Sequence, residues 1–199
     1  MKPTERRILE AAGKLFSQRG FHATGMRAIA RAARVSLGTI YHHFKSKEEM
    51  LLALLREEYE KRRRAIEALK EEDLPVPEMI RRIAELHFRL LLETGPSLRP
   101  LAQGLRGLSP QAKRAAIAVR EEFVNYLASL IGEGISRGQI RRCDPVIAAH
   151  SFLGMVEAVS ARAMEGDEVA ARIQERGAVE LAEIAWRALA PDTKPGGRG

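Results

Sequence analysis

The residues whose chemistry is most easily assigned lie between Ser36 and Lys47. The segment LGTIYHHF opens with a turn of small side chains and continues with a phenol and two imidazoles, and Lys45 and Lys47 follow it. Hydroxyl, phenol and imidazole groups donate hydrogen bonds to phosphates or base edges, and an ammonium group binds a phosphate as a point charge. A first turn with so little side-chain volume can approach a duplex closely. We therefore interpret this segment as a short helix that enters a groove of DNA.

Local signals bound this helix on both sides. Ser36 precedes it and is suited to accept a hydrogen bond from a backbone N–H of the first turn, as an N-cap residue does. After it, the run from Ser46 to Glu49 has the S-x-x-E form of a capping box, so a long helix should begin there and continue to about Glu72. Ile40 and Phe44 lie four residues apart and should face inward.

Two earlier helices are expected to support this element. The first runs from about Thr4 to Gln18 and ends at Gly20, and the second begins at Thr24 or Gly25 and ends near Arg34. Their apolar residues recur at helical spacing, which predicts one small core shared with the reading helix. The inward-facing residues should be Ile8, Ala12, Leu15, Phe16, Phe21, Ile29, Ile40 and Phe44.

The charge distribution agrees with contact to a polyanion. Residues 1–47 contain ten Lys and Arg against Glu5 and Glu10, a net charge of +8, whereas the whole chain carries +7. Residues 48–199 therefore sum to about −1. The excess positive charge lies in the segment that would meet the phosphates. The alternative is a three-helix core with a basic face and no DNA partner.

Residues 4–50 resemble the N-terminal domain of the TetR family of transcriptional regulators. The resemblance is carried by RILEAAGKLFSQRGFHATGMRAIARAARVS and by GTIYHHFKSKEEML after Leu37. Two positions depart from the family pattern: Arg34 stands where a turn glycine is usual, and Gly25 stands where Thr or Ser is frequent. A left-handed backbone at Arg34, or a different closure of the turn, would follow from the first departure.

The resemblance implies a homodimer that presents two reading helices to successive major grooves of a roughly palindromic double-stranded operator. It implies repression as the usual outcome. The residues expected to hold phosphates are Thr24, Arg27, Tyr41, Lys45 and Lys47. Those expected at base edges or methyl groups are Ser36, Leu37, Thr39 and His42, with Gly38 on the same surface.

The rest of the chain reads as helices only, so the predicted fold is all-α with about nine helices. After the long helix, Gly95-Pro96 should end the next one, and a short irregular helix is expected over 97–108. Ser109-Pro110 and Asp144-Pro145 each predict a capped helix start. The predicted domains are a helix-turn-helix domain at 1–47, an effector-binding and dimerisation domain at 48–190, and a disordered tail at 191–199.

An effector site is predicted from two histidines on apolar helix faces, although each histidine taken alone is more typical of a satisfied core residue. The resemblance places both histidines on helices that line the family's pocket. A mostly apolar wall with few polar groups suits a small hydrophobic or amphipathic effector. The predicted lining is Tyr59, His87, Phe88, Leu91, Phe123, Tyr126, His150 and Leu153. An acyl-CoA is one such effector, with Arg89, Arg99, Arg106 and Arg114 near its phosphates.

The last two predicted helices, from Asp144 to about Glu165 and from Val169 to Leu189, are expected to form the dimer interface. The first of them is rich in small residues that permit close helix packing, and two helices from each subunit would make a four-helix interface. The alternative is that these helices only close the core of the monomer. The small residues are Ala148, Ala149, Ser151, Gly154, Ala158 and Ala161.

The sequence offers little for other classes of function. Cys143 is the only cysteine, so no disulfide can form within the chain, and no secretory signal or membrane-length apolar run is present. We find no catalytic constellation, cofactor motif or metal-ligand spacing, and we expect a cytoplasmic protein that is not an enzyme. Two alternatives stay open: an architectural DNA binder without an effector, and a helical protein–protein adaptor.

Overall fold

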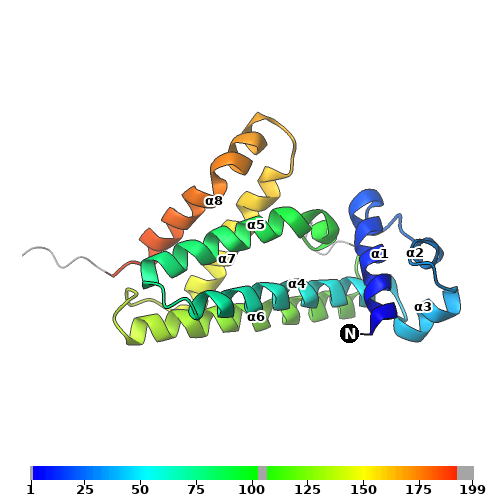
Figure 1. Cartoon of the computed structure of the whole chain (residues 1–199), viewed down its shortest axis with the longest axis horizontal. Helices are drawn as coiled ribbons and strands as arrows, with labels where there is room; N and C mark the ends of the chain where they lie inside the picture. The colour runs from blue at the N-terminus through cyan, green and yellow to red at the C-terminus, as the bar shows by residue number, and fades with distance from the viewer. Residues whose placement is uncertain (1, 103–106, 192–199) are drawn as a thin grey trace, which may run out of the picture. The chain divides into compact units, whose positions relative to one another are not determined.

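The computed structural model describes residues 2–102 and 107–191, which form eight α-helices and no strand (Figure 1). This confirms the all-α prediction. Within the described residues, no helix combines the length and apolar character needed to cross a membrane. Arg106 and all of the predicted disordered tail except Pro191 lie outside the described residues. The helices are α1 (Pro3–Arg19), α2 (Met26–Ala32), α3 (Leu37–His43), α4 (Lys47–Lys70), α5 (Val76–Ala102), α6 (Pro110–Ser136), α7 (Pro145–Ala163) and α8 (Glu168–Leu189).

The chain divides into two compact units. One combines Met1–Lys61 with Glu93–Arg120, and the other combines Arg62–Leu92 with Glu121–Gly199. The boundaries therefore fall inside α4, α5 and α6. The reading helix shares its unit with the end of α5 and the beginning of α6, which the predicted division at residue 47 did not include. The division into a DNA-binding domain at 1–47 and an effector-binding and dimerisation domain at 48–190 remains a prediction.

The first three helices pack around the core predicted for them. Ile8, Ile29 and Ile40 are fully buried, and Phe44 is 3 % exposed. The ring of Phe21 meets that of Phe16 edge to face, with 5.1 Å between centroids. Every residue predicted to face inward is buried. Within the helices, the 3.6-residue period places these apolar side chains on one side.

The turn between α2 and α3 is closed by a left-handed residue. Arg34 has φ 54°, and the N–H of Val35 donates to the carbonyl of Ala30 at 3.0 Å. A side chain at positive φ costs free energy that glycine would not. The first alternative raised for Arg34 is thus the observed one. Gly25 is the N-cap of α2 and contributes no side-chain hydrogen bond.

Side-chain caps set the beginnings of several helices. The Ser36 Oγ accepts the N–H of Thr39 at 3.0 Å, and the Ser46 Oγ accepts the N–H of Glu49 at 3.1 Å. Asp144 accepts the N–H groups of the two residues that follow Pro145, at 2.8 and 3.1 Å. These are the caps that the sequence predicted, and each satisfies backbone donors that the helix itself leaves unpaired.

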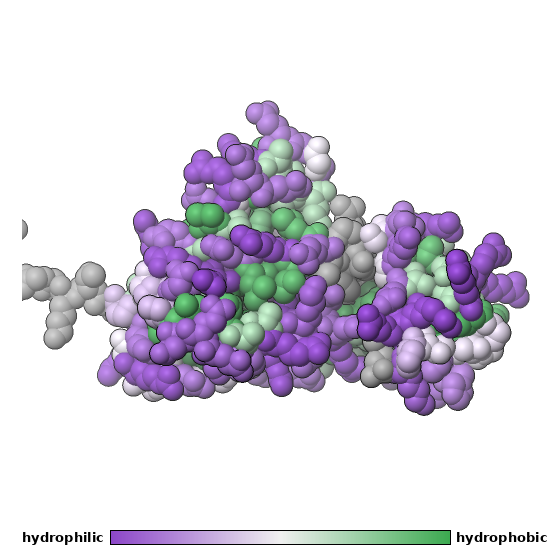
Figure 2. Space-filling model, in the orientation of Figure 1, coloured by the Kyte–Doolittle hydropathy of each residue, from purple (hydrophilic) through white to green (hydrophobic). Residues whose placement is uncertain are grey.

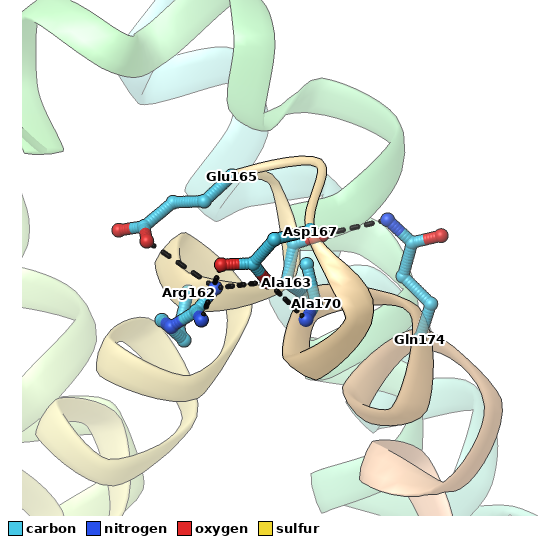
Figure 3. A network of polar contacts seen from close by, with 6 residues as sticks. All are labelled: Arg162, Ala163, Glu165, Asp167, Ala170 and Gln174. Carbon is cyan, nitrogen blue, oxygen red and sulfur yellow. Dashed lines mark hydrogen bonds and ion pairs between the residues drawn. The ribbon is translucent and has the colours of Figure 1, made fainter.

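The α7–α8 turn is held by a polar network (Figure 3). Arg162 makes two parallel hydrogen bonds to Asp167, at 3.0 and 2.7 Å, and Asp167 also caps α8 through the N–H of Ala170. The bonds from Arg162 lower the pKa of Asp167 and raise that of the guanidinium. Across the turn, the Gln174 amide donates to the carbonyl of Ala163 at 2.6 Å. The network fixes the two helices as an antiparallel pair.

One boundary prediction was wrong. The helix α5 does not end at Gly95-Pro96 but continues to Ala102. A proline inside a helix removes one backbone hydrogen bond and crowds the preceding turn, which makes it a breaker in isolation. The separate irregular helix predicted over 97–108 is absent from the described part of that range, so the described residues hold eight helices where about nine were predicted.

Candidate nucleic-acid interface and effector region

The helix α3 presents Gly38, Tyr41 and His42 outward. Its inner side is anchored by Ile40, which is fully buried, while Tyr41 is 51 % exposed. The predicted contact residues that are exposed are Arg27, Ser36, Gly38, Tyr41, His42 and Lys45, and Leu37, Thr39 and Lys47 are half-buried. A short helix with a buried inner face and an outer face of hydroxyls, imidazole and phenol is suited to a groove lined by donors and acceptors.

Gly38 has no structural reason to be glycine. A Cβ built there would meet only the Ser36 Oγ, at 3.7 Å, which is an ordinary contact. Its φ is not in the left-handed region, and glycine inside a helix is less favourable than alanine. The absence of a side chain at Gly38 therefore leaves free space on the outer face of α3, where a duplex would approach.

Two of the predicted phosphate contacts have internal partners. Thr24 is 1 % exposed, and its hydroxyl lies 2.8 Å from the carbonyl oxygen of Gly20. The Lys47 ammonium donates to the carbonyls of Phe21, His22 and Thr24 at 2.8, 3.1 and 3.1 Å. It also lies 4.6 Å from the centroid of the Phe21 ring.

These contacts change how the two residues act. An ammonium has three N–H donors, and three carbonyls use them in this structure. Burial lowers the pKa of Lys47, and neighbouring Glu48 opposes that shift. Lys47 thus fastens the start of α4 to the turn between α1 and α2, and the buried hydroxyl of Thr24 is not available to a phosphate.

A contact that the sequence did not predict joins α4 to the beginning of α6. The Glu48 carboxylate accepts the N–H of Ser109 at 2.7 Å and its hydroxyl at 2.8 Å. Ser109 in turn caps α6 through the N–H of Ala112. The Ser-Pro pair predicted this cap, but its acidic partner lies 61 residues away in sequence.

The segment before α6 also packs closely against the turn between α1 and α2. At Gly107, which has φ +78°, a Cβ would come within 2.3 Å of the His22 ring. The connection that precedes α6 therefore lies against the turn that Lys47 holds. All of these residues belong to the first compact unit.

Three of the predicted effector residues come together in the second unit. His87 is 2 % exposed and stacks on Phe123, with ring centroids 5.9 Å apart and planes inclined by 11°. Phe123 stacks on Tyr126 at 6.1 Å. The Tyr126 hydroxyl donates to Glu67 at 2.7 Å, which ties α6 to α4.

Electrostatics at the end of this stack keep the phenol neutral. Burial and the bond to Glu67 raise the pKa of Tyr126. The same bond is the main cause of the lowered pKa of Glu67, with further support from Lys70 and Arg63. The Arg63 guanidinium lies 5.9 Å from the centroid of the Tyr126 ring.

The remaining predicted effector residues lie in different surroundings. Phe88 belongs to a core cluster with Val156 and Leu181, and Leu91 packs against it. Leu153 is fully buried, and Tyr59 is buried within the first unit. His150 is half-exposed, with its Nε2 3.3 Å from Glu121. The prediction that it lies on an apolar helix face was therefore wrong.

The α1–α3 geometry defines a helix-turn-helix DNA-binding protein. Residues 8–54 match the family described as bacterial regulatory proteins, tetR family, and residues 73–161 match the tetracyclin repressor-like C-terminal domain. The HTH-type transcriptional regulator YhgD of Bacillus subtilis is 34 % identical over 149 residues, which cover 73 % of this chain and 76 % of YhgD. The chain therefore belongs to the TetR family of transcriptional regulators, and the resemblance seen in the sequence is confirmed.

Two further comparisons describe its relatives. The fatty acid metabolism regulator protein of Bacillus subtilis is 27 % identical over 160 residues, 78 % of this chain and 81 % of that protein. The structure of AibR in complex with isovaleryl coenzyme A and operator DNA has a TM-score of 0.65 at 24 % identity, covering 94 % of this chain and 98 % of AibR. The latter similarity shows the shared fold.

Proposed function

We propose that this protein is an effector-controlled transcriptional repressor that binds a roughly palindromic operator as a homodimer. The observation that carries the proposal is the outer face of α3. It exposes Ser36, Tyr41 and His42 around a glycine that the fold does not require. Two such helices would meet successive major grooves about 34–36 Å apart.

A face suited to dimerisation lies on α7 and α8. Along α7, Ile147, Gly154 and Ala158 are exposed and follow one another at helical spacing. On α8, Val179 is 66 % and Ile184 is 51 % exposed. Figure 2 shows apolar patches among polar atoms over α8. Small and apolar side chains on adjacent helices support a four-helix interface with a second copy of the chain.

The effector class is inferred from relatives and from the helical body together. A fatty acid metabolism regulator and a protein bound to isovaleryl coenzyme A are among the similar proteins. We therefore favour a hydrophobic or amphipathic acyl compound, including an acyl-CoA. Arg89 and Arg114 are exposed and accessible to phosphates, whereas the side chain of Arg99 and the whole of Arg106 lie outside the described residues.

The contacts at the beginning of α6 offer a route to the reading helix. The Glu48–Ser109 pair joins α6 to the first turn of α4, where Lys47 holds the α1–α2 turn. A displacement of α6 would therefore act on α4 and on the orientation of α3. Near-complete release of the operator requires the effector to favour the released state by about 5.5 kcal/mol.

The test is selection from a random duplex pool, followed by titration of the enriched duplex at several salt concentrations. An enriched palindrome with a steep salt dependence supports the proposal and supplies the operator for an effector screen. Binding without enrichment would indicate an architectural DNA binder. Absence of binding by protein that has been freed of bound small molecules would leave the adaptor.

A further inference from the structure

A cavity of about 280 Å³ lies in the second compact unit. Its lining residue Phe152 lies 6.2 Å, centroid to centroid, from the ring of His87, but the stacked rings of His87, Phe123 and Tyr126 do not line it. Its walls come from the end of α4 and the turn after it, the first half of α5, the last part of α6 and the connection that follows it, and single residues of α7 and α8. None of the eight residues predicted for the effector site lines it. No role has been assigned to it so far.

The wall is built from branched and aromatic apolar side chains. They include Ile80 and Ile83 of α5, Leu127 and Leu130 of α6, Phe152 of α7 and Leu189 of α8. The cavity is open to solvent on one side, so water can contact these side chains. An apolar occupant would displace that water and add dispersion contacts with the wall.

The charged groups at the cavity cancel one another. Lys70 and Arg137 face Asp73 and Glu133, two positive against two negative charges, and Gln139 is polar and neutral. The Lys70 ammonium is 3.4 Å from Glu67, and Arg137 is 4.0 Å from Glu133. A carboxylate or phosphate brought into the cavity would lose hydration without meeting excess positive charge. The lining therefore favours a neutral molecule.

Backbone hydrogen bonds hold the walls in place. The N–H groups of Gln139 and Ile140 donate to the carbonyl of Gly134, at 2.9 and 3.2 Å. Arg141 donates through its backbone N–H to Leu189 at 3.0 Å and through its side chain to Ala188 at 2.6 Å. The connection between α6 and α7 is thus fastened to the end of α8 on one side and to Gly134 of α6 on the other.

We propose that this cavity binds a neutral, largely apolar molecule of about a dozen non-hydrogen atoms, such as a medium-chain alcohol, ester or amide. The size follows from comparison with an apolar cavity of about 150 Å³, which holds the six carbons of benzene. The polar group of the ligand lies at the rim beside Gln139. Binding stands independently of the proposed function, whereas a role of this ligand as the effector rests on it.

The test is calorimetric titration of the full-length protein with octanol and with octanoate, which share a chain and differ in charge. Octanol is expected to bind one site per protomer, at least about tenfold more tightly than octanoate. Lengthening the alcohol from butanol to hexanol to octanol should strengthen binding about tenfold at each step, because each methylene adds buried apolar surface. Absence of octanol binding, or equal binding of octanoate, overturns the proposal.

Two variants locate the site. Leu130→Trp fills the cavity and should abolish octanol binding, whereas Ile117→Trp places the same side chain at an exposed position of the same helix and should leave binding unchanged. Ile83→Trp serves if circular dichroism shows that Leu130→Trp is unfolded. Unchanged binding in a folded cavity variant overturns the proposal. Operator titration with and without octanol is a separate measurement: binding without release refutes only the effector role.

Discussion

Replacement of Lys47 by methionine separates an internal anchor from a phosphate contact. Methionine keeps the apolar stem over Phe21 but removes the ammonium and its three hydrogen bonds to carbonyls at 2.8–3.1 Å. Hydrogen bonds to a charged group contribute about 1.5–3 kcal/mol each when shielded from water. The His22 carbonyl is exposed, and water replaces that partner. The two part-buried bonds, each taken at the lower end of this range, give an expected loss of about 3 kcal/mol in unfolding free energy.

The salt dependence of operator binding distinguishes the two roles. Loss of a phosphate contact lowers the slope of log affinity against log salt by about one, whereas loss of an anchor weakens binding at every salt concentration with the slope preserved. Lys47→Met should therefore show lower thermal stability, weaker binding and an unchanged slope by fluorescence anisotropy. Lys45→Met is the matched control: Lys45 is exposed, and its loss should reduce the slope at unchanged stability. A reduced slope and unaltered stability in Lys47→Met would refute the anchor.

Three further substitutions test other parts of the molecule. Gly38→Ala should stabilise the fold by up to about 1 kcal/mol in chemical denaturation while weakening operator binding, and unchanged binding would show that α3 leaves space at that position. Tyr126→Phe removes the bond that lowers the pKa of Glu67, and it should cost less than about 1 kcal/mol because the carboxylate is largely solvated. A carboxylate whose pKa is lowered by folding stabilises the folded state at pH values above its unfolded-state pKa. The difference in melting temperature between wild type and Tyr126→Phe should therefore shrink as pH falls below 4.5, the ordinary pKa of a glutamate. A difference that does not change with pH would argue against this bond. Ala158→Arg on the exposed side of α7 should shift the protein toward monomer in sedimentation, whereas Ala118→Arg on α6 should not; two dimeric variants would place the interface elsewhere.

Local hydrogen-bonding chemistry made much of the fold predictable. Ser36, Ser46 and Asp144 were recognised as caps because a side-chain oxygen beside an apolar helical pattern has partners only a few residues away. The inward side of α3 followed from the spacing of Ile40 and Phe44. The partners in these interactions lie within one or two helical turns of each other along the chain, so the sequence alone is enough to predict them.

The family resemblance added what local chemistry does not supply. It implied a homodimer with two reading helices, and it indicated that Arg34 occupies a position usually held by glycine. The left-handed backbone at Arg34 agrees with that indication. The position of a residue within a known pattern can thus predict a backbone conformation that its own type disfavours.

Tertiary contacts decided the roles of several individual residues. Lys47 is a cation at the end of the reading segment by sequence, but its ammonium is drawn to three carbonyls of a turn more than twenty residues earlier. Glu48 meets Ser109 across 61 residues, and His150 meets Glu121 at the surface. The helix α5 passes through Gly95-Pro96 although that pair is a local breaker.

By itself, then, the sequence determined the helices of the reader, its charge and its family, and it predicted the face that reads DNA. Only the tertiary structure decided which polar groups hydrogen-bond to internal partners and where the second unit contains a cavity. Cap and amphipathic signals act between neighbours in the chain, and the chain order records them. A cavity or an anchored ammonium depends on side chains from distant segments packed to within a few ångströms, and chain order does not record that distance.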